Sequence, residues 1–167
     1  MIPLAQLAPR TALTEAQRSA VADAFRGNDT ADTLLPILHA VQDSIGYVPD
    51  AVVPVIAQHL NLSRADVHGV LSFYHWFRRE KPGRHVMHVC RAEACQARGA
   101  RTLESHILKV LGVDYHQTTS DGAITLEPVY CLGLCAQGPS LMVDGEVIAA
   151  MTPDRFDHLA QQLRASS

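Results

Sequence analysis

The chain has 167 residues, of which 47% are hydrophobic and 19% are charged, so it can bury a globular core as one domain or as a core domain with a helical extension. Its formal net charge of −3 argues against nonspecific nucleic-acid binding, which draws its affinity from a basic excess. No apolar run approaches the ~20 residues of a membrane span, and the N-terminus lacks the pattern of a signal peptide, so we expect a cytoplasmic protein without membrane insertion.

The first half of the chain predicts short amphipathic helices. Residues 1–13 carry two prolines and no clear period, which indicates a loose N-terminal arm. Residues 14–77 then show four stretches of helical apolar spacing, separated by brief turns, which predict a small helical bundle. The expected helices start at a capping box of Thr14 with Gln17, cover residues 34–45, run from Asp50 to about Leu60, and follow a second cap at Ser63 with Asp66.

Aromatic and then basic residues follow the expected bundle. The segment S-F-Y-H-W-F (72–77) holds five rings, which either fill the open end of the bundle or form an exposed anchor for a partner. Residues 78–84, R-R-E-K-P-G-R, are interpreted as a basic linker with the Pro-Gly of a domain boundary. A charge run of this kind serves as a solvated surface or as a docking patch.

From His85 onward the hydrophobic period changes towards two, which indicates β-strands. We expect strands at about 85–89, 123–130, 140–143 and 146–150, the last two joined at the hairpin signal Asp144-Gly145. Helices are expected from about Arg98 to Leu111 and after the cap at Thr152. The chain is therefore predicted to be α+β, with a four-stranded mixed sheet and packed helices in residues 85–167 after the N-terminal bundle.

Four cysteines are the strongest candidates for a functional site. They form two pairs, Cys90 with Cys95 and Cys131 with Cys135, with 35 residues between the inner two, and each pair follows an expected strand. Two loops at strand ends can meet and present four soft sulfur ligands around one small centre. These spacings are wider than the C-x2-C hairpins of zinc knuckles, they differ from the plant-type ferredoxin spacing, and no histidine pair lies beside them as in a Rieske centre. A [2Fe–2S] cluster, a structural zinc ion and thiol or disulfide chemistry stay open at this point, although a reducing cytoplasm disfavours stable disulfides.

The residues around these cysteines resemble a known family. The stretches C-R-A-E-A-C-Q (90–96), T-L-E-P-V-Y-C-L-G-L-C (125–135) and V-D-G-E-V (143–147) are similar to the thioredoxin-like [2Fe–2S] ferredoxins, the 24-kilodalton-type subunits of respiratory NADH dehydrogenase and their relatives. Upstream, L-L-P-I-L-H-A-V-Q-D-S-I-G-Y-V-P (34–49) and N-L-S-R-A-D-V-H-G-V-L-S-F-Y (61–74) resemble that family's helical N-terminal part. The similarity covers about residues 14–165.

The resemblance implies a thioredoxin-like fold and a single [2Fe–2S] cluster, with Cys90 and Cys95 on one iron and Cys131 and Cys135 on the other. The chain would then be a one-electron-transfer subunit of an NAD-linked oxidoreductase, exchanging electrons with a flavin- and NAD-binding subunit. Within the family, R-A-E-A (91–94) is closer to the gamma subunit of soluble NAD-dependent molybdenum formate dehydrogenase, which implies a molybdenum catalytic subunit as a further partner. The corresponding subunit of respiratory NADH dehydrogenase or of NAD-reducing hydrogenase is the alternative.

Other chemistry receives little support from the sequence. The nine histidines are scattered, no G-x-G-x-x-G after a strand and no Walker loop occurs, and no cysteine lies beside a plausible base, so the chain alone is not expected to bind NAD or to act as an enzyme. The competing hypotheses are a structural zinc-binding interaction module and a thiol–disulfide enzyme, the latter opposed by the missing C-x-x-C. Arg91 follows Cys90 directly, and we expect its positive charge to favour reduction of a nearby cluster, unless it points away and serves a partner surface.

Overall fold

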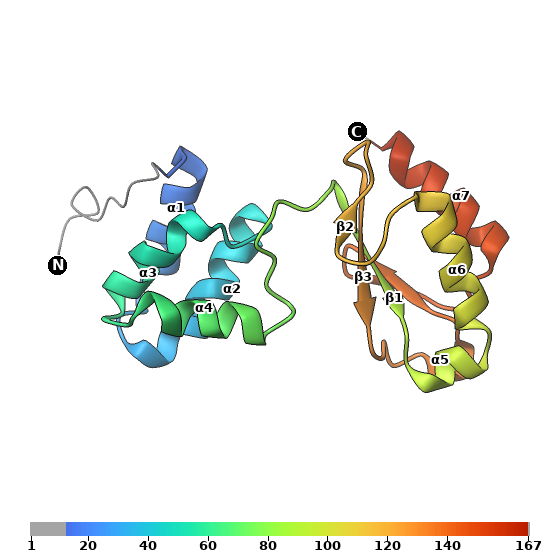
Figure 1. Cartoon of the computed structure of the whole chain (residues 1–167), viewed down its shortest axis with the longest axis horizontal. Helices are drawn as coiled ribbons and strands as arrows, with labels where there is room; N and C mark the ends of the chain where they lie inside the picture. The colour runs from blue at the N-terminus through green and yellow to red at the C-terminus, as the bar shows by residue number, and fades with distance from the viewer. Residues whose placement is uncertain (1–12, 167) are drawn as a thin grey trace. The chain divides into compact units, whose positions relative to one another are not determined.

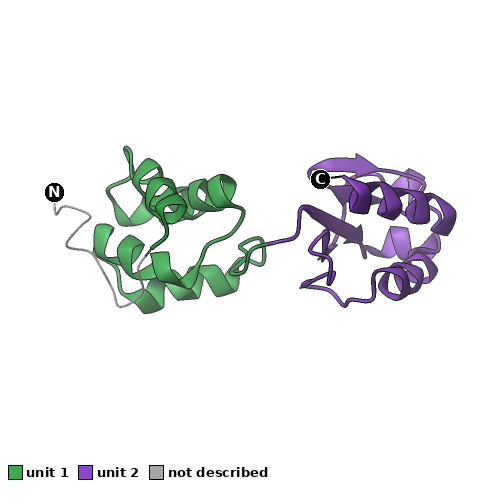
Figure 2. Ribbon diagram, turned by 90° about the horizontal axis from the view of Figure 1, so that it is seen from above, with its two compact units in different colours: residues 1–81 green, residues 82–167 purple. Residues whose placement is uncertain are grey.

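The computed structural model describes residues 13–166, so the loose arm expected over residues 1–13 lies, apart from Leu13, outside the described residues. The chain divides into two compact units, residues 1–81 and 82–167, and the division lies inside the basic segment 78–84 (Figure 2). Each unit has a hydrophobic core of its own. No helix among the described residues is long and apolar enough to cross a membrane.

The N-terminal unit is helical, as the apolar spacing predicts. Its elements (Figure 1) are α1 (Glu15–Ala24), η2 (Ala31–Thr33), α2 (Leu34–Ile45), η3 (Asp50–Val52), α3 (Val53–His59) and α4 (Arg64–Phe73), where η marks a short 3-10 helix. The predicted capping box at Thr14 is present, because its hydroxyl accepts the Gln17 amide and the Gln17 side chain accepts the Thr14 amide. Ser63 and Asp66 form the same reciprocal cap at the start of α4.

The apolar faces of these helices meet in one core. Val21 of α1, Ile37 and Leu38 of α2 and Ile56 of α3 are fully buried there. The third helix differs from its expected start at Asp50, because its first turn is the 3-10 helix η3 and the α-helix begins at Val53. The physical reason is Pro54, which has no amide to donate back to the carbonyl of Asp50 and is therefore tolerated only in the first turn of an α-helix.

The aromatic segment after α4 divides between the core and the surface. Phe77 is buried in the helical core, whereas Phe73, Tyr74 and Trp76 are 75%, 42% and 50% exposed. One ring therefore fills the bundle and three others stay accessible, and the use of these three as an anchor for a partner stays a prediction. We refer to Phe73, Tyr74 and Trp76 as the aromatic surface.

The basic segment 78–84 is anchored at both ends. The amide of Arg78 donates to Oε1 of Gln42, in α2, at 2.7 Å. On the other side of the division, the amide of Gly83 donates to the hydroxyl of Thr125 at 2.7 Å. The linker expected here is thus fixed to a folded unit at each end.

The C-terminal unit is a mixed sheet with helices packed on it. Its elements are β1 (His85–Cys90), α5 (Glu93–Ala97), α6 (Ala100–Leu111), β2 (Gln117–Thr118), β3 (Ile124–Val129), η4 (Cys135–Gln137), β4 (Leu141–Val143), β5 (Glu146–Ile148) and α7 (Pro153–Ala165). The strand order is β2-β3-β1-β4-β5, with β1 parallel to β3 and antiparallel to β4. Helices α6 and α7 lie side by side along the sheet (Figure 1).

The core of this unit lies between the sheet and the two long helices. Met87 of β1, Leu126 of β3 and Leu141 of β4 are fully buried, and they pack with Ile107 of α6 and Phe156 of α7. Full burial of one such side chain contributes about 1.5–3 kcal/mol, so this layer is a main source of the unit's stability.

Two elements differ from the expected four strands and from the helix expected to begin at about Arg98. The sheet has a fifth strand, because Gln117 and Thr118 pair antiparallel with β3 at its edge. Both residues are polar and exposed, so no apolar alternation marks β2 in the sequence. Helix α5 is also absent from the expected elements, since five residues are too few to show a helical period. Gly99, in the left-handed conformation (φ 93°), separates α5 from α6, which therefore begins at Ala100 rather than at Arg98.

Candidate metal centre

The sheet brings both cysteine pairs to one edge. Strands β1 and β3 are parallel neighbours with Cys90 in register with Val129, so their carboxyl ends lie together. Cys90 is the last residue of β1, and Cys131 is the second residue after β3. The other two cysteines lie on the helical turns that follow, Cys95 in α5 and Cys135 at the start of η4. The two strand-end loops therefore meet, and each contributes two sulfurs.

The two pairs differ in burial. Cys90 and Cys95 are each 1% exposed and pack with the buried Ala100 at the start of α6. Cys131 is exposed and Cys135 is partly exposed. The site thus has a closed side, formed by the first pair, and an open side, formed by the second.

The two sulfurs of the open pair are not joined in a disulfide and lie close enough to bind one metal atom. The Sγ atoms of Cys131 and Cys135 are 3.6 Å apart, whereas a disulfide bond is about 2.05 Å long. Two thiolates bound tetrahedrally to one metal at about 2.3 Å lie roughly 3.8 Å apart, close to the observed spacing. All four cysteines are free thiols. Among residues 13–166, no three Cys, His, Asp or Glu side chains are placed to hold a single metal ion.

Burial and hydrogen bonding act in opposite directions on the closed pair. Burial raises the pKa of the Cys90 thiol. Burial acts in the same direction on Cys95, but hydrogen bonds from Ser140 and Cys90 and the positive charge of Arg98 outweigh it, so the pKa of Cys95 is lowered. Cys95 is therefore the member of this pair whose anionic form the surroundings favour.

The neighbouring cysteines disfavour the charged form of Cys135. The hydrogen bond with Cys131 and the charge of that residue raise the pKa of Cys135, and the charges of Cys95 and Cys90 act in the same direction. Cysteines of both pairs thus influence the ionisation of Cys135. A bound cation would relieve this repulsion, because metal binding favours deprotonated thiols.

The loop that carries the open pair has an unusual backbone. Cys131 has φ 137°, a conformation that residues with side chains rarely adopt, and Gly133 has φ 79°. With this geometry the Gly133 amide donates to Sγ of Cys131 at 3.3 Å. Strained backbone of this kind collects at ligand-binding sites. An amide directed at a cysteine sulfur is also one of the interactions by which proteins tune iron–sulfur clusters.

A second loop, which links η4 to β4, closes over Cys95. A Cβ atom at Gly138 would lie 3.1 Å from Sγ of Cys95, a tight contact that would require the sulfur or the loop to shift by a few tenths of an ångström. The guanidinium of Arg98 donates from Nε to the carbonyl of Gly138 at 3.0 Å, and Oγ of Ser140 lies 3.6 Å from Sγ of Cys95. Sequence reasoning missed Arg98 and Ser140. Arg98 follows Cys95 by three residues, a spacing that could have indicated its place beside the site. No pattern in the nearby sequence marks Ser140.

Arg91 contacts two residues of its own unit. Its Nε atom lies 3.0 Å from Oε1 of Glu104 in α6, and its guanidinium stacks over the Tyr115 ring with its Cζ 5.2 Å from the ring centroid. Burial and the nearby Glu104 carboxylate raise the pKa of Tyr115. The guanidinium of Arg91 is therefore held by partners within its own unit, and its effect on the reduction of a cluster stays a prediction.

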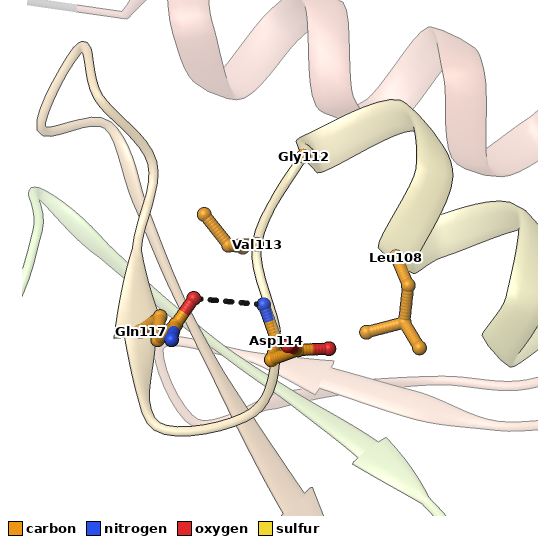
Figure 3. Close-up of a pocket in the computed structure, with 5 residues that line it drawn as sticks. All are labelled: Leu108, Gly112, Val113, Asp114 and Gln117. Carbon is orange, nitrogen blue, oxygen red and sulfur yellow. Dashed lines mark hydrogen bonds between the residues drawn. The ribbon is translucent and has the colours of Figure 1, made fainter.

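A surface hollow elsewhere on this unit lacks the chemistry of the cysteine site. It has a volume of about 190 Å³, and Figure 3 shows it where the end of α6 meets the loop to β2, with the Asp114 amide donating to Gln117 Oε1 at 3.0 Å. Helix α6 starts beside the cysteines and carries the chain roughly 16 Å away before this hollow, at about 1.5 Å per residue. The lining residues are Leu108, Gly112, Val113, Asp114 and Gln117.

Comparison with known proteins identifies relatives along most of the chain. The model of the thioredoxin-like [2Fe–2S] ferredoxin family matches residues 20–164. An NADH-quinone oxidoreductase subunit from Pseudomonas aeruginosa is 36% identical over 146 residues, which is 87% of this chain and 88% of that protein. The NADH-quinone oxidoreductase subunit of the same name from Escherichia coli is 33% identical over 153 residues, which is 91% of this chain and 92% of that protein.

Solved structures agree at the level of the fold. An NAD⁺-reducing [NiFe]-hydrogenase in the H2-reduced state superposes with a TM-score of 0.70 at 22% identity over 83% of this chain. The air-oxidised form gives 0.67 at 23% identity over 92% of this chain. This chain spans about a quarter of the length of those hydrogenase chains, 23% and 24% respectively. The family match and the two relatives together show that the chain belongs to the thioredoxin-like [2Fe–2S] ferredoxin family.

Proposed function

We propose that this chain carries one [2Fe–2S] cluster and transfers single electrons within a larger NAD-linked oxidoreductase. The observation that carries the proposal is the meeting of four free cysteines, two from each strand-end loop, in a chain of this family. Cys90 and Cys95 would hold one iron, and Cys131 and Cys135 the other. When bound, such a cluster takes up and gives up one electron at a time.

The surroundings of the cysteines suit that task. The closed side excludes water from Cys90 and Cys95, and the Gly133 amide is directed at a sulfur on the open side. Tyr130, which precedes the exposed Cys131, is itself 69% exposed. Electrons would therefore pass most directly through the open side, where a partner can approach the site without displacing the core.

A flavin- and NAD-binding subunit is the partner that we propose. Two kinds of observation support it: the named relatives are subunits of NADH-quinone oxidoreductase, and the structural neighbours are NAD⁺-reducing hydrogenases. The aromatic surface of the N-terminal unit offers a place for docking, since tryptophan, tyrosine and phenylalanine are enriched in interface cores. The chain would work in the cytoplasm as part of such a complex.

The complex to which this chain belongs can be proposed first as a general type and then as a specific enzyme. The named relatives support a complex of the NADH-quinone oxidoreductase or NAD-reducing hydrogenase type. The R-A-E-A sequence at residues 91–94 favours the gamma subunit of NAD-dependent formate dehydrogenase, with a molybdenum catalytic subunit as a further partner. Arg91 has an internal partner in Glu104, which reduces the weight of that stretch. Purification of the intact complex and measurement of its molybdenum, nickel and flavin contents would decide between these candidate complexes.

The cluster itself is tested by metal analysis of the purified chain. Protein prepared without oxygen should be red-brown, bleach with dithionite and contain two irons and two acid-labile sulfides per chain. Replacing any of the four cysteines by alanine should abolish the EPR signal of the reduced protein, whereas Ser105→Ala on the surface of α6 should leave it unchanged. A colourless protein with one zinc ion would instead support the structural zinc module, and a colourless metal-free protein would support thiol chemistry.

A further inference from the structure

Ser140 touches both cysteines of the closed side. Its carbonyl accepts the amide of Cys90 at 3.1 Å, and its hydroxyl oxygen lies 3.6 Å from Sγ of Cys95. The residue is only 1% exposed. A buried hydroxyl needs a hydrogen-bond partner, and the sulfur of Cys95 is the partner that the structure provides.

The backbone on either side holds this hydroxyl in place. The carbonyl of Gly138 accepts a hydrogen bond from Arg98, and the carbonyl of Pro139 accepts the amide of Met151 at 2.9 Å. Strand β4 begins at the next residue and pairs with the central strand β1. Ser140 is thus fixed by its neighbours, and its distance to the sulfur does not depend on a mobile loop.

We infer that Ser140 is a positioning residue that donates its hydroxyl hydrogen to the Cys95 sulfur and thereby favours the reduced state of the cluster. This inference rests on the proposed function. A cysteine that ligates a metal has lost its proton, so the hydroxyl must be the donor and the sulfur the acceptor.

The direction of the effect follows from charge. Reduction adds one electron from the partner and forms or breaks no covalent bond, so the sulfur ligands become more negative. A hydrogen bond to a more negative acceptor is stronger, and the low dielectric of a buried site increases that difference. The hydroxyl of Ser140 therefore stabilises the reduced state more than the oxidised state.

The test measures the reduction potential of the full chain with its cluster, by redox titration followed by EPR. In Ser140→Ala we expect the equilibrium constant for one-electron reduction to fall about five- to tenfold, which is about 40–60 mV. Ser140→Thr keeps the hydroxyl and should stay within about twofold of the parent. Ser105→Ala removes an exposed hydroxyl of α6 and should not change the potential.

A spectroscopic measurement isolates the hydrogen bond from general packing. The reduced parent should show an exchangeable proton coupled to the cluster by ENDOR, which disappears in deuterium oxide and in Ser140→Ala. An unchanged potential and a retained proton in Ser140→Ala would overturn the inference while the cluster, and with it the proposed function, remained. Equal falls in the alanine and threonine variants would overturn it as well, because the effect would then be one of packing. Absence of any cluster from the parent would instead refute the proposed function itself.

Discussion

Replacement of Gly138 by alanine should destabilise the C-terminal unit. The added Cβ would lie 3.1 Å from Sγ of Cys95, 3.4 Å from Cα of that residue and 3.5 Å from Cδ of Arg98. The arginine contact is ordinary, and a flexible side chain can move away from it. The sulfur cannot move so easily, because it is buried on a short side chain under the same loop.

The size of the effect comes from two opposing terms. Overpacking of a buried site costs about 1–3 kcal/mol. Alanine also restricts the unfolded chain, and where its native backbone is allowed this stabilises a protein by about 0.4–1 kcal/mol. Gly138 has φ −65° and ψ 164°, which alanine adopts without strain, so the second term applies here. We therefore expect a net loss of about 0.5–2 kcal/mol in the free energy of unfolding.

Urea unfolding of the reduced, metal-free chain would measure this loss. Trp76, the only tryptophan, reports on the N-terminal unit, and far-UV circular dichroism follows both units. The matched control is Gly69→Ala in α4, where the added Cβ meets nothing within 4 Å. That change should stabilise the N-terminal unit by about 0.5–1 kcal/mol, because alanine is the better helix former.

The reasoning would be refuted by a Gly138→Ala variant whose C-terminal unit unfolds at the same urea concentration as the parent, or at a higher one. The sulfur would then relax at no cost, and the loop would not close tightly over Cys95. A variant that lost stability but still assembled its cluster with an altered EPR spectrum would support the tight approach directly.

Three further predictions concern charge, docking and a helix cap. Arg91→Ala should lower the reduction potential by about a few tens of millivolts, because it removes a positive charge and leaves the Glu104 carboxylate unpaired, and should cost at most about 1 kcal/mol of stability in urea unfolding. Trp76→Ser should weaken binding of the flavin-bearing partner about tenfold or more in a titration, as for a tryptophan at the centre of an interface. Hydrogen bonds from the Ser63 hydroxyl and amide lower the pKa of Asp66, so Ser63→Ala should raise that pKa towards its usual range in an NMR titration.

Each of these three predictions would be contradicted by a specific result. A potential unchanged within error in Arg91→Ala would mean that the charge of this side chain does not act on the cluster. Val147, 43% exposed on the C-terminal unit, is the control for docking. If Trp76→Ser and Val147→Ser bound the partner with equal affinity, the proposed docking role of the aromatic surface would be contradicted. For the cap, the folded pKa of Asp66 lies below the unfolded one. Its stabilisation is therefore present above the usual pKa of about 3.9 and is lost as the pH falls through the folded value. An Asp66 pKa unaffected by Ser63→Ala would contradict this account.

Features set by near neighbours in the chain could be predicted from the sequence. The capping box at Thr14 and the hairpin at Asp144-Gly145 depend on residues within a few positions, and both form as expected. The two turn positions of that hairpin have φ 50° and 92°, which the Asp-Gly pair tolerates. The period of the apolar residues also placed Cys90 at a strand end, and from there the meeting of the two cysteine loops could be inferred.

Features set by distant residues could not be predicted in this way. The hydroxyl of Ser140 reaches Cys95 across 45 positions of the chain, and no pattern in the sequence links the two. The ion pair of Arg91 with Glu104 also could not be predicted, because only the fold brings these two side chains within reach. Edge strand β2 likewise is defined by its pairing with β3, and no apolar alternation in the sequence marks it.

The unequal burial of the two cysteine pairs would determine where oxidants reach a bound cluster. A cluster held here would have one iron facing solvent at Cys131 and the other enclosed at Cys90 and Cys95. Oxygen, peroxide and chelators would enter by the same side as the electrons, so oxidative damage would begin at the outer iron. A partner docked over Tyr130 would then do more than exchange electrons, because it would also shield the cluster from oxidants. Free protein that has not yet joined its complex would be the most vulnerable form in the cell.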